Sequence, residues 1–286
     1  KVVYRGFVDQ ERGRRHPGFA VAWEAHPWDR EPDRGASRRA QLAARGPYRA
    51  AIPADIANAT VEIDAGLQAE AEDAIREIAR FDAEVTAAAV RRTAHQGEGS
   101  PTELAPLASV LLRTESASSS EIEGVTAGAR ALAMAAVEAK AGPNAELVTA
   151  NVTAMRRAMD LADDIDIGTI LAVHHALLDR HEYAAPGRLR DQQVWIGRNA
   201  LSPHTASFVP PHHTRVPEAL NDLFGFVHRA DLPVLTQVAI AHAQFETIHP
   251  FTDGNGRTGR TLIHAMLRHS GVTRTLTVPV SAAPLP

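Results

Sequence analysis

Apolar residues recur at steps of three and four along most of the chain after Ile63, and this spacing is typical of helices with one buried face. The first run, over residues 65–92, also consists of good helix formers. Its buried stripe is expected to hold Leu67, Ala71, Ile75, Ile78 and Phe81. A chain patterned in this way buries helix against helix.

More helices are expected at about 102–114, 120–139, 145–163, 167–179, 214–229, 233–248 and 255–269. The first of these has an expected apolar stripe of Leu104, Leu107, Val110 and Leu111. The helical pattern breaks between about 186 and 212, where apolar residues at 194–196 and 208–209 flank a run of turn residues. The predicted fold class is mostly α, with one small β-hairpin.

Composition excludes several classes of function. The 286 residues include 30 basic and 34 acidic side chains, so no basic excess indicates a nucleic-acid or membrane surface. Without cysteine there are no disulfides, thiolate zinc sites or cysteine nucleophiles. No apolar run approaches the ~18 residues of a membrane span, and the start lacks a signal-peptide core. We therefore expect a cytoplasmic protein.

Three regions are expected along the chain. Residues 1–50 are rich in Arg, Pro and Gly and predict an irregular arm. Residues 51–140 form an N-terminal helical region, and residues 141–286 form the main domain. Because the first residue is Lys1 and not methionine, we expect a fragment of a longer protein.

The segment HPFTDGNGRTGR, residues 249–260, carries most of the chemical information. Gly254, Gly256 and Gly259 satisfy the dinucleotide fingerprint G-x-G-x-x-G, but the context excludes it. A helical stripe precedes this loop where a buried strand is needed, and no acidic residue follows Asp253 to bind a ribose.

The same loop still predicts an anion site. Glycines on both sides of Asn255 let successive N–H groups converge at the start of a helix. Arg257 and Arg260 flank that point, and Asp253 beside it indicates a Mg²⁺ ion bridging phosphate oxygens. His249 is a candidate general base. A lone histidine is more often a packing or capping residue, but here these groups converge within twelve residues.

The segment IHPFTDGNGRTGR resembles the signature of the Fic-domain family, His-x-Phe-x-Asp/Glu-Gly-Asn-Gly-Arg-x-x-Arg, with every fixed position filled. The wider resemblance runs from about Tyr48 to the end and includes RGPYRAAIPADIA, PGRLRDQQVWIG with FVPP, and AHAQFETIHPF. It implies a Fic-type helical bundle with 141–286 as the catalytic domain. The implied activity is transfer of AMP from ATP to a Ser, Thr or Tyr hydroxyl of a target protein, with release of pyrophosphate.

The resemblance also implies a role for each residue of the motif. His249 resembles the base that deprotonates the target hydroxyl, Phe251 the buried anchor of the loop, and Asp253 the Mg²⁺ ligand. Arg260 resembles the clamp on the γ-phosphate. The implied ATP-binding residues of the loop are Gly254, Asn255, Gly256, Arg257, Thr258, Gly259 and Arg260.

Upstream, Ser119, Glu123 and Gly124 resemble the family's inhibitory motif, Ser/Thr-x-x-x-Glu-Gly/Asn. The implied pairing of Glu123 with Arg260 would keep the γ-phosphate from seating, which is the self-inhibited class with its brake in the same chain (class II). The alternative is a capping box at a helix start, since Ser120 and Glu123 have that spacing.

The segment 190–211 resembles the family's flap, a hairpin that docks the target protein by strand pairing. The residues expected to close over the adenosine are Val194, Trp195, Ile196 and Gly197. The alternative is a plain surface hairpin with Trp195 as a packing residue. The pairs His174-His175 and His212-His213 are not expected to bind zinc, because adjacent helical histidines diverge and the second pair lacks a carboxylate cluster.

Two other functions stay open beside autoinhibited AMP transfer. One keeps the fold and removes AMP, or transfers another phosphate group or nucleotide. The other is a non-catalytic ATP sensor that acts through a further module, since relatives often continue into a winged-helix module beyond this sequence. ATP, an unidentified target protein, self-modification and a homo-oligomer are the expected partners; membranes and, for this fragment, nucleic acids are not.

Overall fold

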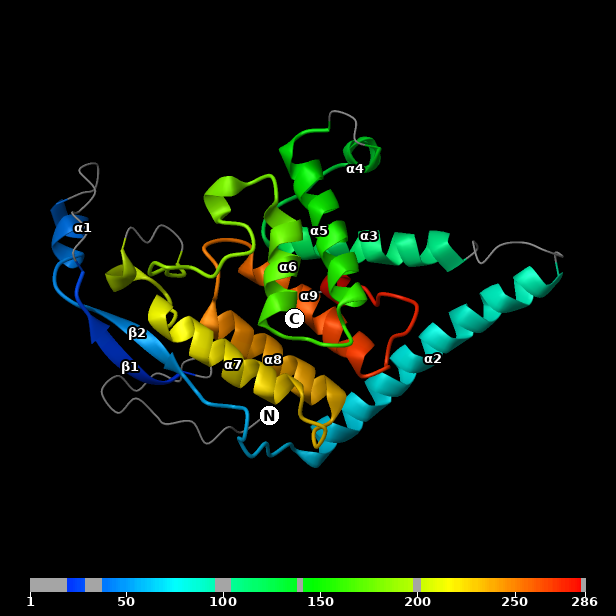
Figure 1. The fold of residues 1–286 in the computed structure, drawn as a ribbon, viewed down its shortest axis with the longest axis horizontal. Helices are drawn as coiled ribbons and strands as arrows, with labels where there is room; N and C mark the ends of the chain where they lie inside the picture. Colours follow the sequence, from blue (N-terminus) through cyan, green and yellow to red (C-terminus); the bar gives the residue numbers. More distant parts are fainter. Residues whose placement is uncertain (1–19, 29–37, 96–103, 138–140, 198–201, 284–286) are drawn as a thin grey trace.

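The computed structural model describes residues 20–28, 38–95, 104–137, 141–197 and 202–283 (Figure 1). Two strands, β1 (Ala20–His26) and β2 (Tyr48–Pro53), flank the short helix α1 (Arg38–Ala43). The other helices are α2 (Ala65–His95), α3 (Leu104–Ile122), α4 (Ala129–Ala136), α5 (Pro143–Asp160), α6 (Ile167–Leu178), α7 (Val216–Val227), α8 (Val234–Ile248) and α9 (Asn255–His269). The expectation of a mostly α fold is confirmed.

Helix α9 lies at the centre of the bundle and packs against α3, α5, α6 and α8. The helices α5 to α9 surround one apolar core, whose largest fully buried side chains include Leu220, Phe226, Phe245, Ile248 and Phe251. Each such side chain contributes roughly 1.5–3 kcal/mol through the apolar surface it removes from water. The motif segment 249–260 thus begins a helix that is held on several sides.

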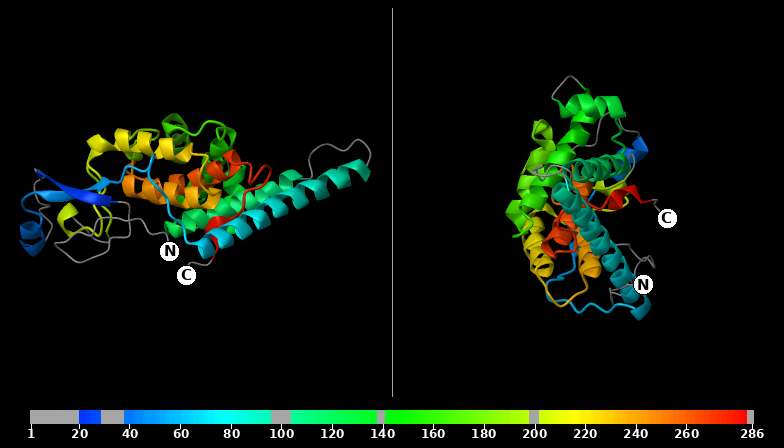
Figure 2. Two further views of the ribbon diagram at one scale, coloured as in Figure 1. Left: turned by 90° about the horizontal axis from the view of Figure 1, so that it is seen from below. Right: turned by 90° about the vertical axis from the view of Figure 1, so that its right-hand side faces the viewer.

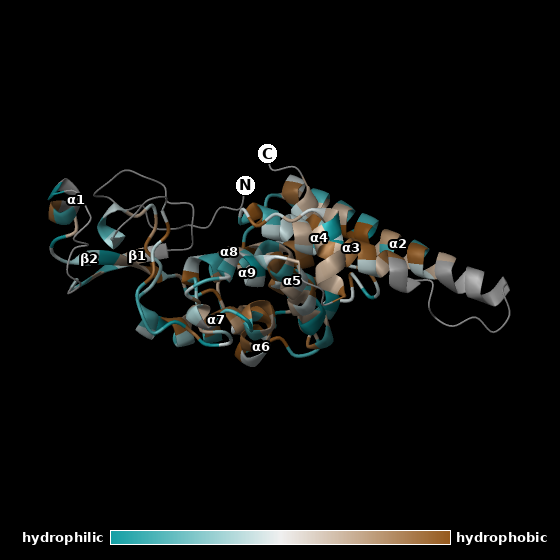
Figure 3. Ribbon diagram, turned by 90° about the horizontal axis from the view of Figure 1, so that it is seen from above, coloured by the Kyte–Doolittle hydropathy of each residue, from teal (hydrophilic) through white to brown (hydrophobic). Residues whose placement is uncertain are grey.

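Helix α2 begins after Asp64, whose carboxylate accepts from the amides of Gly66 (2.9 Å) and Leu67 (3.3 Å) and so caps the helix. Its C-terminal half projects beyond the bundle (Figures 1 and 2). Hydrophobic and hydrophilic residues alternate along its ribbon, as an amphipathic helix requires (Figure 3). Ile75 and Ile78 of the expected stripe pack against the core, whereas Phe81 is exposed.

The inner face of α3 is polar, which the sequence pattern did not indicate. Leu107 and Val110 of the expected apolar stripe are exposed, and the side chain of Leu104 lies outside the described residues. The side chains of α3 that are buried are Leu112, Glu115, Ser116, Ser119 and Ser120. Since buried polar groups need partners, this face must be matched by polar groups on the helices that it contacts.

The expected helix at 120–139 is wrong, because α3 ends at Ile122 and α4 starts only at Ala129. The amide of Val125 donates to the carbonyl of Ser120 (3.0 Å), and the amide of Gly124 donates to Glu121 (2.8 Å). With Gly124 at φ +74°, this is a Schellman C-cap. The capping-box alternative is therefore also wrong: Ser120 lies at a helix end, and its hydroxyl donates to the carbonyl of Ser116 (2.8 Å).

Part of the arm expected to be irregular forms an antiparallel pair, β1 with β2. Residues 1–19 and 29–37 of that arm lie outside the described residues. The flap region contains one antiparallel bridge, Ile196 with Phe208, as expected for two short extended pieces. Strand β2 adjoins it, since the amide of Ala51 donates to the carbonyl of Val209 (3.0 Å). None of the helices in the described part of the chain is both long and apolar enough to cross a membrane.

A buried polar cluster joins α3 to α9 and to the C-terminal segment. The Glu115 carboxylate is fully buried and accepts from His264 Nε2 (2.9 Å), the Ser281 hydroxyl (2.6 Å) and the Ser281 amide (2.8 Å). Burial alone would raise the pKa of Glu115, but the bonds from His264 and Ser281 outweigh it and hold that pKa below its ordinary value. This cluster fixes which turn of α3 faces which turn of α9.

We predict that Glu115→Ala lowers the free energy of unfolding by roughly 3–5 kcal/mol, because it strands the buried partners of a charged group. Urea unfolding followed by circular dichroism measures this change. Because the pKa of Glu115 is lowered on folding, its stabilising contribution is present above its ordinary pKa of 4.5 and is lost as the pH falls further. The exposed Glu121→Ala on the same helix should change stability by less than about 0.5 kcal/mol. Equal unfolding curves for the two variants would contradict the role of the cluster.

Candidate active site

The turn between α8 and α9 places His249 in a left-handed backbone conformation. His249 is the C-cap of α8, with φ +51° and ψ +63°. Pro250 follows it and cannot continue the helix. Positive φ is uncommon for a residue with a Cβ and costs of order 1 kcal/mol or more, so surrounding contacts must hold it.

Arg190 supplies several of those contacts. Its buried guanidinium donates to the carbonyls of His249 (2.8 Å), Ile248 (3.3 Å) and Pro211 (2.6 Å). Its backbone amide donates to Pro250 (2.9 Å). One side chain, at the start of the flap segment 190–211, thus satisfies the last carbonyls of α8 and ties them to Pro211 at the end of that segment.

The rest of the loop is closed by Asn255 and supported by His174. The Asn255 amide group accepts from the Phe251 N–H (2.9 Å) and donates to the Phe251 carbonyl (3.0 Å). Phe251 is fully buried and stacks on the His174 ring at 3.7 Å. Burial lowers the pKa of His174 to about 4, so the ring is neutral. It accepts from the Gly187 amide (2.9 Å) at Nδ1, and its Nε2–H donates to the Asp253 carbonyl (3.1 Å).

The start of α9 offers donors that the described residues do not satisfy. Arg257 is buried, and its Nε and Nη1 have no hydrogen-bond partner within the described part of the chain; the same holds for Thr258 Oγ1. Nη2 of Arg257 lies 3.9 Å from the carboxylate of Asp253. The first N–H groups of a helix have no partner within it. Buried, unpaired donors at such a place fit an anion.

Asp253 can contribute to metal binding only if a bound substrate supplies further oxygen atoms to the metal. Its side chain is 48% exposed, and Oδ1 accepts from the Gly254 amide (2.7 Å). The described residues contain no group of three or more histidine, aspartate or glutamate side chains arranged to hold a metal. A single carboxylate combined with substrate phosphates and water is nevertheless a usual setting for Mg²⁺.

Arg260 lies three residues after Arg257 on α9 and is paired with the end of α3. Its Nη2 donates to the Glu123 carboxylate (2.8 Å) and to the Ser119 carbonyl (2.7 Å), and its Nε donates to the Ser119 hydroxyl (2.9 Å). The carboxylate of Glu123 also lies against Gly256, so close that a Cβ there would collide with it. Glu123 therefore covers the first turn of α9 from outside.

Two titratable side chains near the turn have pKa values shifted in opposite directions. Burial and, to a smaller extent, the positive charge of Arg190 lower the pKa of His249 to about 4. Burial raises the pKa of Glu246 to about 7, against the opposing charge of Arg260 and with a smaller contribution from nearby Glu123. At neutral pH the His249 imidazole is thus uncharged and able to accept a proton. Such divergent pairs are typical of catalytic sites.

The flap residues Val194 to Gly197 lie beside the N-terminal sheet. The rings of Trp195 and Trp28 meet edge to face at 5.6 Å, next to a small buried cluster of Tyr48, Ala50 and Val209. Gln193 joins the two parts, accepting from the Tyr48 hydroxyl (3.1 Å) and donating to the Pro210 carbonyl (2.9 Å). The structure thus gives Trp195 a packing role.

The sequence did not indicate that Arg190 and His174 hold this loop, or that a buried carboxyl group, Glu246, lies beside His249. The contacts of Arg190 and His174 with the loop span 59 and 79 residues, so no local pattern announces them. Glu246 stands three residues before His249, and a carboxyl on the buried face of an otherwise apolar helix end was a usable signal.

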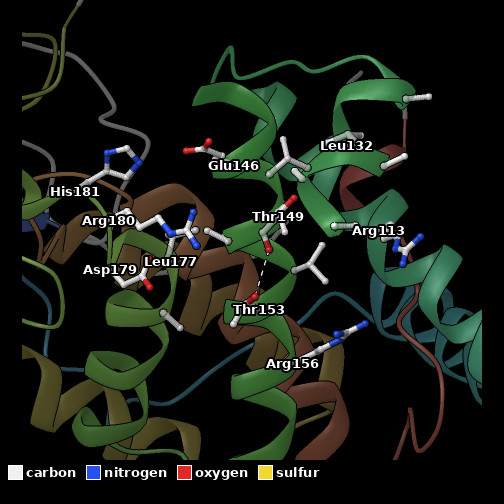
Figure 4. A pocket seen from close by; sticks show the side chains of 18 residues that line it. Arg113, Leu132, Glu146, Thr149, Thr153, Arg156, Leu177, Asp179, Arg180 and His181 are labelled. Atoms are coloured by element: carbon white, nitrogen blue, oxygen red, sulfur yellow. Dashed lines mark hydrogen bonds between the residues drawn. The ribbon is translucent and has the colours of Figure 1, made fainter. Parts of the chain in front are cut away.

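A hollow of about 770 Å³ lies elsewhere, among α4, α5 and α6 (Figure 4). Its walls combine apolar side chains such as Leu132 and Leu177 with charged ones such as Arg156 and Asp179. None of its lining residues belongs to the segment 249–260. The site at the start of α9 is therefore defined by its chemistry and not by the size of this hollow.

Comparison with known proteins agrees with this geometry. Residues 164–267 match the Fic/DOC family. The chain is 34% identical over 112 residues to protein adenylyltransferase fic-1 of Caenorhabditis elegans, and 30% identical over 113 residues to protein adenylyltransferase Fic of Nematostella vectensis. Each alignment covers 38% of this chain, but only 20% and 24% of those proteins. The chain thus spans about a fifth of the length of the curated relatives it matches.

Solved structures with the same fold include a Fic domain containing signaling protein from Bacteroides thetaiotaomicron (TM-score 0.53, 16% identity, 65% of this chain and 73% of that chain). A fragment of Fic-1 from Caenorhabditis elegans has a TM-score of 0.51 and 23% identity over 75% of this chain and 62% of that one. At identities this low, the two structures show only that the fold is similar. The matched segment contains the complete motif and the helices that hold it, so residues 164–267 of this chain are a Fic domain, a member of the Fic/DOC family.

Proposed function

We propose that this protein is an autoinhibited protein adenylyltransferase that moves AMP from ATP to a hydroxyl of a target protein. The observations that support it most are the buried donors of Arg257, which have no partner among the described residues, and the uncharged His249 on the turn that precedes the same helix. The relatives that share the domain are named protein adenylyltransferases. A cradle for phosphates with a base at its edge suits nucleotidyl transfer, in which the enzyme supplies positioning and charge neutralisation.

In this proposal the polyphosphate lies along the first turn of α9. The N–H groups of residues 254–257 and the guanidinium of Arg257 face the α- and β-phosphates, and Arg260 faces the γ-phosphate. Asp253, which is half exposed, would hold Mg²⁺ together with phosphate oxygens. The ion would neutralise charge on the phosphates.

The transfer step needs one base. The oxygen of the target hydroxyl forms a bond to the α-phosphorus, and the bond from that phosphorus to the oxygen bridging the β-phosphate breaks. Pyrophosphate leaves with the electron pair of the broken bond. The hydroxyl proton passes to His249, whose Nδ1 is buried, so that Nε2 is the nitrogen that faces the incoming hydroxyl.

The brake is the contact of Arg260 with Glu123 and Ser119. While these groups hold the guanidinium, it cannot bind a γ-phosphate, and the Glu123 carboxylate repels the anion. The pair joins a 12% exposed guanidinium to a 41% exposed carboxylate, so solvent weakens it. We infer that the pair can open without unfolding the helices that carry it.

The first prediction concerns ATP binding, which we expect to be measurable once Glu123 is replaced by glycine. In that background Arg260→Ala should weaken ATP affinity roughly 10-fold to 100-fold, the effect of losing one or two charge-assisted bonds. Isothermal titration with ATP and Mg²⁺ measures it. Arg268→Ala, near the other end of α9, is the matched control and should leave affinity unchanged. Unchanged affinity in both Arg260→Ala and Gly256→Ala would contradict the placement of ATP.

The second prediction concerns the base. His249→Ala in the Glu123→Gly background should reduce AMP transfer by about 100-fold or more, since a general base contributes that much. ATP affinity should change little, because the imidazole acts on the hydroxyl. Transfer is followed with labelled ATP, and circular dichroism confirms the fold. A variant that keeps the parent's rate would show that another group takes the proton.

The third prediction concerns the brake. Glu123→Gly should free Arg260 and raise self-modification and target modification well above the wild-type level. Wild type, Glu123→Gly and Glu123→Gly/His249→Ala are incubated with ATP labelled at the α- or, separately, the γ-phosphate. We expect label from the α-phosphate, and none from the γ-phosphate, to be incorporated, and only in the Glu123→Gly variant.

Each other outcome of the labelling experiment has a definite meaning. Incorporation of the γ-label would indicate phosphorylation. No incorporation despite ATP binding would favour an ATP sensor. Equal labelling of wild type and Glu123→Gly would show that the Arg260–Glu123 contact is only structural.

A further inference from the structure

Glu246 is a buried acid beside His249 that the proposed function does not use. It lies on the last turn of α8, and its Oε2 is 4.0 Å from His249 Nδ1. Its Oε1 is buried and has no hydrogen-bond partner in the described part of the chain, and the same is true of His249 Nδ1. Glu246 and His249 thus each have a buried polar atom without a hydrogen-bond partner among the described residues. Such atoms are rare in the core of a protein, because burying them unpaired is unfavourable.

Gly259 explains how the carboxyl group of Glu246 fits. A Cβ at position 259 would come within 2.6 Å of Glu246 Oε1 and 3.0 Å of the Phe245 ring. Glycine inside a helix costs about 1 kcal/mol relative to alanine. Its presence on the first turns of α9 therefore keeps a space for this carboxyl group. The sequence led us to expect Gly259 among the ATP-binding residues. In the structure, Gly259 lies against the Glu246 carboxyl group.

The groups around Glu246 come from three segments. Arg260 faces it from α9, Glu123 from the end of α3, and His249 from the turn after α8. His242, one turn earlier on α8, has its ring edge 3.2 Å from the same Gly259 position. One cation and two carboxyl groups therefore lie close together, and the charges of Arg260 and Glu123 act on Glu246 in opposite directions.

The proposed reaction creates a positive charge at His249. The hydroxyl proton arrives at Nε2, and the resulting imidazolium lies in a buried site next to Arg190, whose charge opposes it. A carboxylate facing the opposite nitrogen offsets that cost, as the third member of a Ser-His-Asp triad does. The two atoms are 4.0 Å apart, beyond hydrogen-bond distance, and such contacts often tighten only when substrate is bound.

Resting on the function proposed above, we propose that Glu246 is a positioning residue of the transfer reaction, whose carboxylate orients His249 through its Nδ1 face and stabilises the imidazolium formed when the target hydroxyl loses its proton. Gly259 makes room for it. The proton passes from the hydroxyl to His249, and Glu246 only balances its charge.

The test compares Glu123→Gly with Glu123→Gly/Glu246→Gln, in which the amide keeps the shape and removes the charge. We expect kcat to fall about tenfold or more while KM for ATP stays within about twofold. Glu123→Gly/Glu121→Gln removes an exposed carboxylate from the end of α3 and is the matched control, with the parent's kcat. Glu123→Gly/Gly259→Ala, which should displace the Glu246 carboxyl group, is expected to lose kcat to a similar degree.

The pH profile separates a positioning role from a merely structural one. The active carboxylate form of Glu246 is lost as the pH falls below a pKa of about 7, so kcat of the parent should fall on that side. Because Glu123 contributes to the raised value, its removal moves this inflection to lower pH. Glu246→Gln should lack the inflection, since the pKa of His249, about 4, lies further below.

A second readout does not need activity. In wild type, the NMR signals of the His249 ring should show a step near pH 7 as Glu246 ionises, and the step should vanish in Glu246→Gln. A Glu123→Gly parent that transfers no AMP would overturn the proposed function and this inference with it. If the parent is active, an unchanged kcat or pH profile in Glu246→Gln, or a His249 signal without the step, overturns this inference alone.

Discussion

The buried contact of Glu115 with His264 and Ser281 is the constraint on which the arrangement of the site depends. Glu115 and Ser119 are four residues apart on α3, as are Arg260 and His264 on α9, so the two helices meet in two successive rungs. The contact of Glu115 with His264 is fully buried, whereas the contact of Arg260 with Ser119 and Glu123 is open to solvent. The buried contact fixes the position of α3 along α9, so the contact at Arg260 can break and form again between the same residues.

This division bears on how the weak contact of Arg260 with Glu123 could act as the proposed brake. An ion pair with an exposed carboxylate contributes only about 0–1 kcal/mol by itself. Suppressing a reaction 100-fold needs about 2.7 kcal/mol between the closed and open states. Ser119 adds two hydrogen bonds to the guanidinium, and the buried rung removes most of the entropy that an untethered carboxylate would lose. In the proposed autoinhibition, the segment that carries Ser119 and Glu123 would therefore act through its fixed position more than through the strength of one bond.

The local elements could be predicted from the sequence because the information is local. The 3.6-residue period located most of the longer helices, and the motif placed His249, Asp253 and Gly254 on the turn before α9. The pairing of Glu123 with Arg260, 137 residues apart, came only from the family resemblance. The polar face of α3 was missed because periodicity identifies an apolar stripe but not which stripe is buried. The break at Gly124 was missed because helix formers lie on both sides of it.

The glycines of α9 show why the rest needed coordinates. In the sequence, Gly256 and Gly259 are cradle residues with a common role. In the structure, each leaves room for a different carboxyl group: Glu123 lies against Gly256 and Glu246 against Gly259. Arg260, on the same turn, faces both. Two carboxyl groups therefore lie near one cation at the positive end of a helix. In the function proposed above, a polyphosphate that replaces Glu123 would still meet Glu246. The protonation of Glu246 would then set how much negative charge the incoming anion encounters, and so would couple binding at Arg260 to the proton balance at His249.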